Sequence, residues 1–117
     1  MKKKILVADD DPAIVDAIQM ILEDEGFDVE TTVNGETVGK MNKRHPDLLL
    51  LDIWMSGQDG REIAKRLKHE KKTKNIPIIL ISATKDIEKS AKEAGADNFL
   101  AKPFEIQDLL KIVHRYV

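Results

Sequence analysis

The chain has 117 residues, of which 42% are hydrophobic and 34% charged, so we expect a single domain over residues 1–117 with one core. Nineteen basic against twenty-one acidic residues give a formal charge of -2, which disfavours direct binding of nucleic acid. The lack of cysteine excludes disulfides and thiolate metal sites and is compatible with the cytoplasm. No apolar run is long enough to span a membrane.

Short apolar runs alternate with longer amphipathic stretches along the chain. The first run, at residues 5–8, predicts a strand, and Asp11 with the proline after it predicts the start of a helix that runs to Gly26. Residues 28–33 alternate apolar and polar side chains, which is typical of a strand at a sheet edge. A weaker helix is predicted to about His45.

The second half repeats the alternation. Continuous apolar runs at residues 48–51 and 78–81 predict central parallel strands that helices cover on both faces. Three further helices and one short strand complete the pattern, at residues 60–68, 86–95, 98–101 (the strand) and 105–116.

Strands that alternate with helices predict an α/β fold with a doubly wound, five-stranded parallel sheet of order 2-1-3-4-5, the flavodoxin-like (βα)5 arrangement. In such sheets ligands bind outside the carboxyl ends of the strands, where the chain reverses between the first and third strands. The polar residues at the predicted strand ends are Asp9, Asp10, Asp52, Ser82 and Lys102. Three carboxylates, a hydroxyl and an ammonium group are therefore expected at one rim.

Three close carboxylates repel one another, by about 4 kcal/mol per pair at ~4 Å and an effective dielectric of ~20. Protonation of one carboxyl would relieve the repulsion, but oxygen ligands of this kind also suit Mg2+. A carboxylate can attack a phosphoryl group when a metal and a cation neutralise the transferring oxygens. Lys102 could supply that cation, and the Ser82 hydroxyl could donate to a phosphate oxygen.

The same residues carry a family resemblance that covers essentially the whole chain. Together they resemble the motifs of the response-regulator receiver family: Asp9-Asp10, Asp52, Ser82-Ala83 and Lys102-Pro103-Phe104. The resemblance implies a phosphoacceptor switch rather than an enzyme, with autocatalytic phosphorylation and dephosphorylation at most. It implies a sensor histidine kinase or phosphotransfer protein as donor, and a downstream protein or effector domain as target.

Carried over residue by residue, the resemblance makes Asp52 the phosphoacceptor and places Ser82 and Lys102 in contact with the phosphoryl group. The implied Mg2+ ligands are Asp9, Asp10, Asp52 and the backbone carbonyl of Trp54.

One position departs from the usual family pattern, and a second carries the aromatic residue that the family keeps. Ser56 stands where the family usually has proline, and Phe99 stands where it keeps a rotating aromatic, often tyrosine. The implied switch residues are Ser82 and Phe99, and we expect burial to favour the inward rotamer of Phe99 even before phosphorylation. The bond between Lys102 and Pro103 is a candidate cis peptide, since X-Pro bonds can adopt cis.

Other classes fit the sequence less well. A phosphatase that forms an aspartyl phosphate usually needs an acid two residues after its nucleophile, where this chain has Trp54. A serine hydrolase with a G-x-S-x-G motif around Ser56 would need glycine at that same position. Nucleotide and flavin sites would meet repulsion from the acids after the first strand. The open alternative is a pseudo-receiver, an interaction module regulated without phosphate, and an effector domain beyond Val117 is equally open.

The first predicted helix carries two adjacent apolar stripes, one formed by Val15, Ile18 and Leu22 and the other by Ile14, Ala17 and Ile21. This is broader than one core contact needs. We expect an apolar docking patch for the kinase or phosphotransfer domain, composed of Ile14, Ala17, Pro103 and Phe104. The alternative is a helix wedged deeply into the core, in which case all four side chains would be buried.

Overall fold

The computed structural model describes residues 2–35, 38, 45–55 and 57–117. Its elements in chain order are β1 (Lys4–Ala8), α1 (Pro12–Asp24), β2 (Asp28–Thr32), β3 (Leu48–Asp52), β4 (Trp54–Met55), β5 (Gln58–Asp59), α3 (Gly60–His69), β6 (Ile78–Ser82), α4 (Ile87–Ala94), β7 (Asn98–Ala101) and α5 (Ile106–Tyr116). The weaker helix predicted to about His45 falls largely outside the described residues, as does Ser56. No helix in the described part of the chain has the length and apolarity needed to cross a bilayer.

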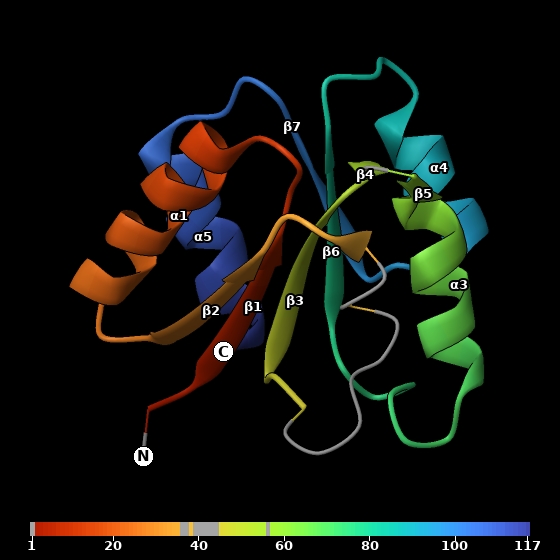
Figure 1. Cartoon of the computed structure of the whole chain (residues 1–117), viewed down its shortest axis with the longest axis horizontal. Coiled ribbons are helices and arrows are strands. Elements are labelled where there is room, and N and C mark those ends of the chain that lie inside the picture. Colours follow the sequence, from red (N-terminus) through yellow and green to blue (C-terminus); the bar gives the residue numbers. More distant parts are fainter. Residues whose placement is uncertain (1, 36–37, 39–44, 56) are drawn as a thin grey trace.

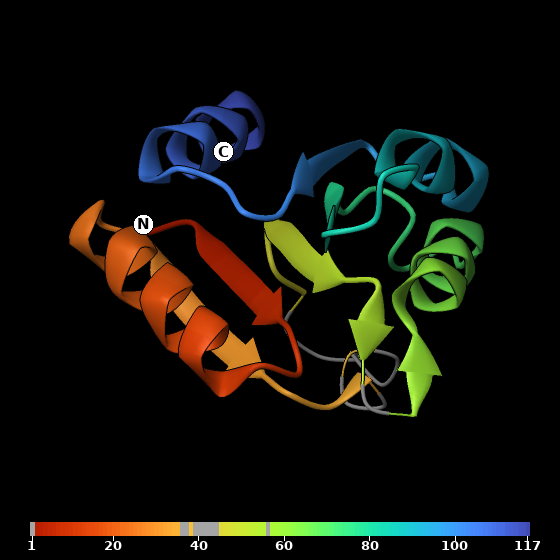
Figure 2. The same ribbon diagram turned by 90° about the horizontal axis from the view of Figure 1, so that it is seen from above.

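Five parallel strands form one sheet in the order β2-β1-β3-β6-β7, which is the predicted order 2-1-3-4-5 of the main strands. Helices α1 and α5 cover one face, and α3 and α4 cover the other (Figures 1 and 2). The edge position of β2 and the central positions of β3 and β6 are confirmed. A short antiparallel hairpin of β4 and β5 follows β3, and the sequence pattern did not predict it.

The two central strands are buried along their whole length, because helices cover both faces of the sheet. Alternate side chains enter two separate cores, one on each face of the sheet, whereas the composition predicted a single core. In β3, Leu49 and Leu51 pack with α3 and α4, whereas Leu48 and Leu50 pack with α1 and α5. This packing on both faces fixes the register of β3 in the sheet, and therefore the position of Asp52 at its carboxyl end.

The predicted helix ends are close to those in the structure. The side chain of Asp11 caps α1 by accepting a hydrogen bond from the backbone N–H of Ala13 at 3.0 Å. The first helix ends at Asp24, two residues before its predicted limit, and Glu25 is its C-cap. Gly95 closes α4 in the left-handed conformation, with φ of 77°, as its predicted C′ role requires.

Gly60 allows α3 to begin directly against the end of β3. Its backbone N–H donates to the carbonyl of Ile53 at 2.6 Å. A Cβ atom at this position would collide with the carbonyl oxygen of Asp52 and approach Cα of Ile53 to 2.9 Å. Glycine therefore permits a backbone contact that fixes the segment on which Asp52 lies.

We predict that Gly60→Ala lowers the free energy of unfolding by roughly 2–3 kcal/mol, because its Cβ would meet backbone atoms that cannot move independently. Denaturant unfolding measures this loss. Gly57→Ala is the matched control: its Cβ would meet nothing within 4 Å, so it carries only the strain of a positive φ, roughly 1 kcal/mol. Equal losses in the two variants would contradict the close-approach argument.

Candidate functional site

Three carboxylates meet at the carboxyl ends of the neighbouring strands β1 and β3. Asp9, Asp10 and Asp52 each have a carboxylate oxygen within 4.8 Å of the others. Asp9 and Asp52 are buried, whereas Asp10 is exposed. The backbone N–H of Asp11 donates to Oδ1 of Asp9 at 3.0 Å, which orients that carboxylate. The parallel pairing of β1 with β3 thus produces the predicted acidic cluster.

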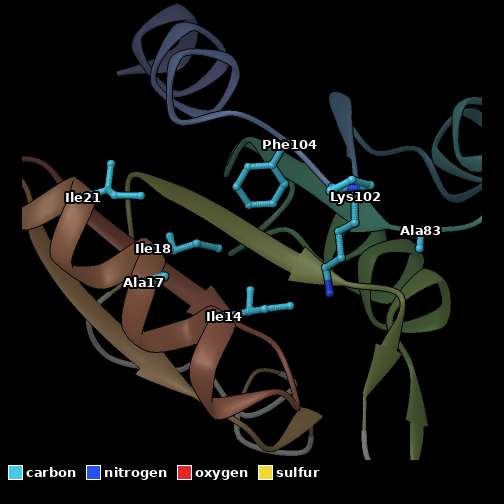
Figure 3. A pocket seen from close by; sticks show the side chains of 8 residues that line it. Ile14, Ala17, Ile18, Ile21, Ala83, Lys102 and Phe104 are labelled. Atoms are coloured by element: carbon cyan, nitrogen blue, oxygen red, sulfur yellow. The ribbon is translucent and has the colours of Figure 1, made fainter.

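Lys102 brings a positive charge into this cluster from the end of β7. Its Nζ lies 2.8 Å from Oδ2 of Asp9 and 3.5 Å from Oδ1 of Asp52, and Figure 3 shows the side chain directed toward the end of β3. The backbone N–H of Lys102 donates to the carbonyl of Ser82 at 2.9 Å, and the Lys102–Pro103 peptide bond is cis. Burial by itself would lower the pKa of Lys102, but the hydrogen bond to Asp9 and the nearby carboxylate charges raise it on balance.

Asp52, the candidate phosphoacceptor, lies where its ionised form is disfavoured. Burial raises the pKa of Asp52 to about 6, and the negative charges of Asp9 and Asp10 add to the rise. Lys102 opposes the shift through its charge and its hydrogen bond, without cancelling it. The ionised form of Asp52 is therefore disfavoured in the resting site and would gain from an additional cation.

Ser82 is buried at the end of β6 and lies at the predicted rim. Its hydroxyl forms a hydrogen bond with the hydroxyl of Thr84, and the backbone N–H of Thr84 donates to Oγ of Ser82 at 3.1 Å. Sequence reasoning missed Thr84. The signal that could have revealed it is the pair of hydroxyl residues two positions apart at a strand end, since such residues bond to backbone two residues on.

Trp54 lies in β4, two residues after Asp52. Its side chain is 57% exposed, and the guanidinium of Arg61 stacks over its ring at 5.1 Å from the centroid. The side-chain hydrogen bond from Arg61 holds the pKa of Asp59 below its ordinary value. The role predicted for the Trp54 backbone carbonyl as a metal ligand stays a prediction.

Phe99 is half-buried in β7 and packs against the core between the sheet and helices α3 and α4. In the register of β6 and β7 it pairs with Leu80, while Ser82 pairs with Ala101. The two predicted switch residues therefore lie on adjacent strands, two residues apart in level. Their movement stays a prediction.

The donor set fits a hard divalent cation. The cluster brings together three carboxylates, and their charges face one nearby ammonium group. Mg2+ favours oxygen ligands and usually binds one or two carboxylates together with several waters. The strained ionisation of Asp52 adds an electrostatic reason for a cation to bind here.

Residues 5–114 match the response regulator receiver domain family. The chain belongs to this family. The receiver domain is a signalling switch rather than an enzyme, and its acidic pocket is of the kind that holds Mg2+ and accepts a phosphoryl group. Sequence and structure comparisons with individual proteins agree with this assignment.

Among curated proteins, the receiver domain is 34% identical over 110 residues to the DNA-binding dual master transcriptional regulator RpaA of Synechocystis, covering 92% of this chain and 46% of that protein. A putative response regulator from Chloroflexus aurantiacus is 33% identical with a TM-score of 0.91, covering 99% of this chain and 98% of that one. The chemotaxis response regulator CheY4 of Vibrio cholerae is 30% identical with a TM-score of 0.90, covering both chains fully (100%). The chain spans about half the length of the curated relatives it matches.

We predict that Asp52→Asn stabilises the receiver domain near neutral pH. The folded chain retains the Asp52 proton up to about pH 6, whereas the unfolded chain loses it near the ordinary pKa of 3.8. Ionisation of Asp52 therefore costs the folded state no stability below about pH 3.8. The cost grows as the pH rises to about 6, and above that pH it is complete and reaches about 3 kcal/mol.

Urea unfolding of both proteins between about pH 4 and 8 measures the effect. The stability advantage of Asp52→Asn should grow with pH across this window. A difference that is constant with pH would contradict the raised pKa. Asp16→Asn, at an exposed position of α1, is a control for the loss of one charge.

Proposed function

We propose that this receiver domain accepts a phosphoryl group on Asp52 from a histidine kinase or a phosphotransfer protein, with Mg2+ bound, and so changes the face that it presents to a downstream protein or effector domain. The observation that carries the proposal is the buried Asp52 carboxylate beside two further carboxylates and one ammonium group. Residues 1–117 act in this proposal as one domain in the cytoplasm.

The chemistry is a substitution at phosphorus. A carboxylate oxygen of Asp52 attacks the phosphorus atom of the donor, a P–O bond to Asp52 forms, and the bond to the leaving group breaks. The leaving group departs with the electron pair and takes up a proton from water, and nothing is oxidised or reduced. With a pKa of about 6, Asp52 is ionised in most molecules at neutral pH and can act as the nucleophile.

The chain's own cation neutralises charge on the transferring group. Lys102 is held within reach of Asp52, at 3.5 Å in the resting site, and its raised pKa keeps it protonated. Asp9, Asp10 and Asp52 would hold Mg2+, which supplies further positive charge to the phosphoryl oxygens when bound. Ser82 would donate its hydroxyl to one of those oxygens.

The donor protein is proposed to dock on an apolar hollow of about 380 Å³ beside the site (Figure 3). Its lining includes Ile14 and Ala17 of α1 together with Lys102, Pro103 and Phe104. Ile14 and Phe104 are half-buried, and Ala17 and Pro103 are exposed. Because these four side chains are not all buried, the alternative of a helix wedged deeply into the core is disfavoured, although the other stripe of α1 is buried.

Readout is proposed to pass through Ser82 and Phe99. A phosphoryl group on Asp52 offers acceptor oxygens that the bare carboxylate lacks, so Ser82 gains a differential contact that can shift an equilibrium. Movement of Ser82 would open space on the side of β7 where Phe99 is half-buried. A pseudo-receiver would lack this phosphate-dependent step.

We predict that acetyl phosphate with Mg2+ adds one acid-stable, alkali-labile phosphoryl group to Asp52. Intact-mass measurement should show one added phosphoryl group, and peptide mapping should locate it on the segment that contains Asp52. Asp52→Asn should abolish the modification, while Asp59→Asn, at the N-cap of α3, should retain it. Unchanged labelling of Asp52→Asn would overturn the proposed function.

We predict that Asp10→Asn weakens Mg2+ binding at least several-fold, because it removes one carboxylate from the acidic cluster. Trp54 is the single tryptophan and lies two residues after Asp52, so its fluorescence during a Mg2+ titration reports binding. Asp11→Asn is the matched control, since asparagine keeps the helix cap and removes the adjacent charge. Equal weakening by both substitutions would indicate a general charge effect and would remove Asp10 from the site.

A further inference from the structure

The Ser82 hydroxyl is already engaged in the resting structure. It is bonded to the hydroxyl of Thr84, and its oxygen also accepts the backbone N–H of Thr84 at 3.1 Å. Ser82 is only 1% exposed, whereas Thr84 is exposed to solvent. The Thr84 hydroxyl can therefore form a hydrogen bond with water, whereas the buried Ser82 hydroxyl needs a partner within the protein.

This difference decides which hydroxyl donates. A buried donor needs an acceptor within the protein, because an unsatisfied one is costly. Among the described residues, Thr84 is the hydroxyl acceptor bonded to Oγ of Ser82. If Ser82 donates, the exposed Thr84 hydroxyl can give its own proton to water. If Thr84 donated instead, the buried proton of Ser82 would have no acceptor among the hydrogen bonds of the described residues.

We propose that Thr84 is a positioning residue that holds the Ser82 proton in the resting state and competes with the phosphoryl group for it. The inference rests on the proposed function, in which Ser82 donates to a phosphoryl oxygen. A hydroxyl has one proton, so Ser82 must stop donating to Thr84 when it donates to the phosphoryl group. Donation from Ser82 to Thr84 thus stabilises the unphosphorylated state selectively.

Loss of this bond would affect the segments that precede and follow residue 84 in the chain. Ala83, between the two hydroxyl residues, lines the apolar hollow proposed for the donor protein. Asp86, the N-cap of α4, follows two residues after Thr84. Release of Thr84 therefore reaches the docking hollow and the start of α4 together, because all these residues share one short segment.

The test compares Thr84→Val and Thr84→Ser with the natural protein. Valine has nearly the same shape but no acceptor oxygen, whereas serine keeps the hydroxyl. Each protein is titrated with beryllofluoride, a phosphoryl mimic, at saturating Mg2+, and Trp54 fluorescence reports binding. Thr84→Val should bind the mimic roughly 3- to 10-fold more tightly, because the hydrogen bond from the Ser82 hydroxyl to the side chain of residue 84 no longer has to be broken. Thr84→Ser should bind as the natural protein does.

A second readout needs neither metal nor mimic. In NMR spectra of the free proteins, backbone amides of residues 83–92 in Thr84→Val should shift toward the mimic-bound positions of the natural protein. In a Ser82→Ala background, adding Thr84→Val should change the affinity less than twofold. Unchanged or weaker binding by Thr84→Val, or equal tightening without Ser82, would overturn the role of Thr84. If the natural protein failed to bind the mimic, the proposed function itself would fail.

Discussion

Repulsion among three carboxylates at one sheet edge is the constraint on which the rest of the structure depends. The neighbouring strands β1 and β3 bring Asp9 and Asp52 together in a buried place, and Asp10 adds a third charge within 4.8 Å. One ammonium group, that of Lys102, contacts two of these acids. The excess negative charge disfavours the resting site and favours any cation that enters it. Such strain is common where function needs an unstable arrangement.

The scaffold sustains this strain because its central strands cannot shift. Leucine side chains of β3 pack in two cores, and Gly60 allows the start of α3 to lie against the backbone of Asp52. Sliding β3 by one residue would reverse which side chains face each core. The acidic site is therefore supported by packing that extends through the whole sheet, while its loops remain at the surface.

Much of this arrangement was predictable from sequence. Apolar runs predicted β1, β3 and β6, and alternation of apolar and polar residues predicted β2. Since parallel strands end at the same edge, the residues after them had to meet there. The caps at Asp11 and Gly95 followed from residue chemistry. The β4–β5 hairpin did not, because two-residue strands have no periodicity. The Ser82–Thr84 bond depends on side-chain rotamers, which no pattern of apolar and polar residues specifies.

Two groups connect the acidic site to surfaces that a partner could touch, and they respond to different changes. Lys102 lines the apolar hollow and contacts the acids, lying closer to Asp9 than to Asp52. A phosphoryl group on Asp52 would replace one negative charge with nearly two, so it would attract Lys102 away from Asp9. Ser82 responds instead to new acceptor oxygens and acts toward α4 through Thr84. In the proposed mechanism, the donor-docking hollow thus responds to charge through Lys102 and to hydrogen bonding through Ala83, and the start of α4 responds to hydrogen bonding through Thr84. A single chemical event at Asp52 can therefore alter both surfaces.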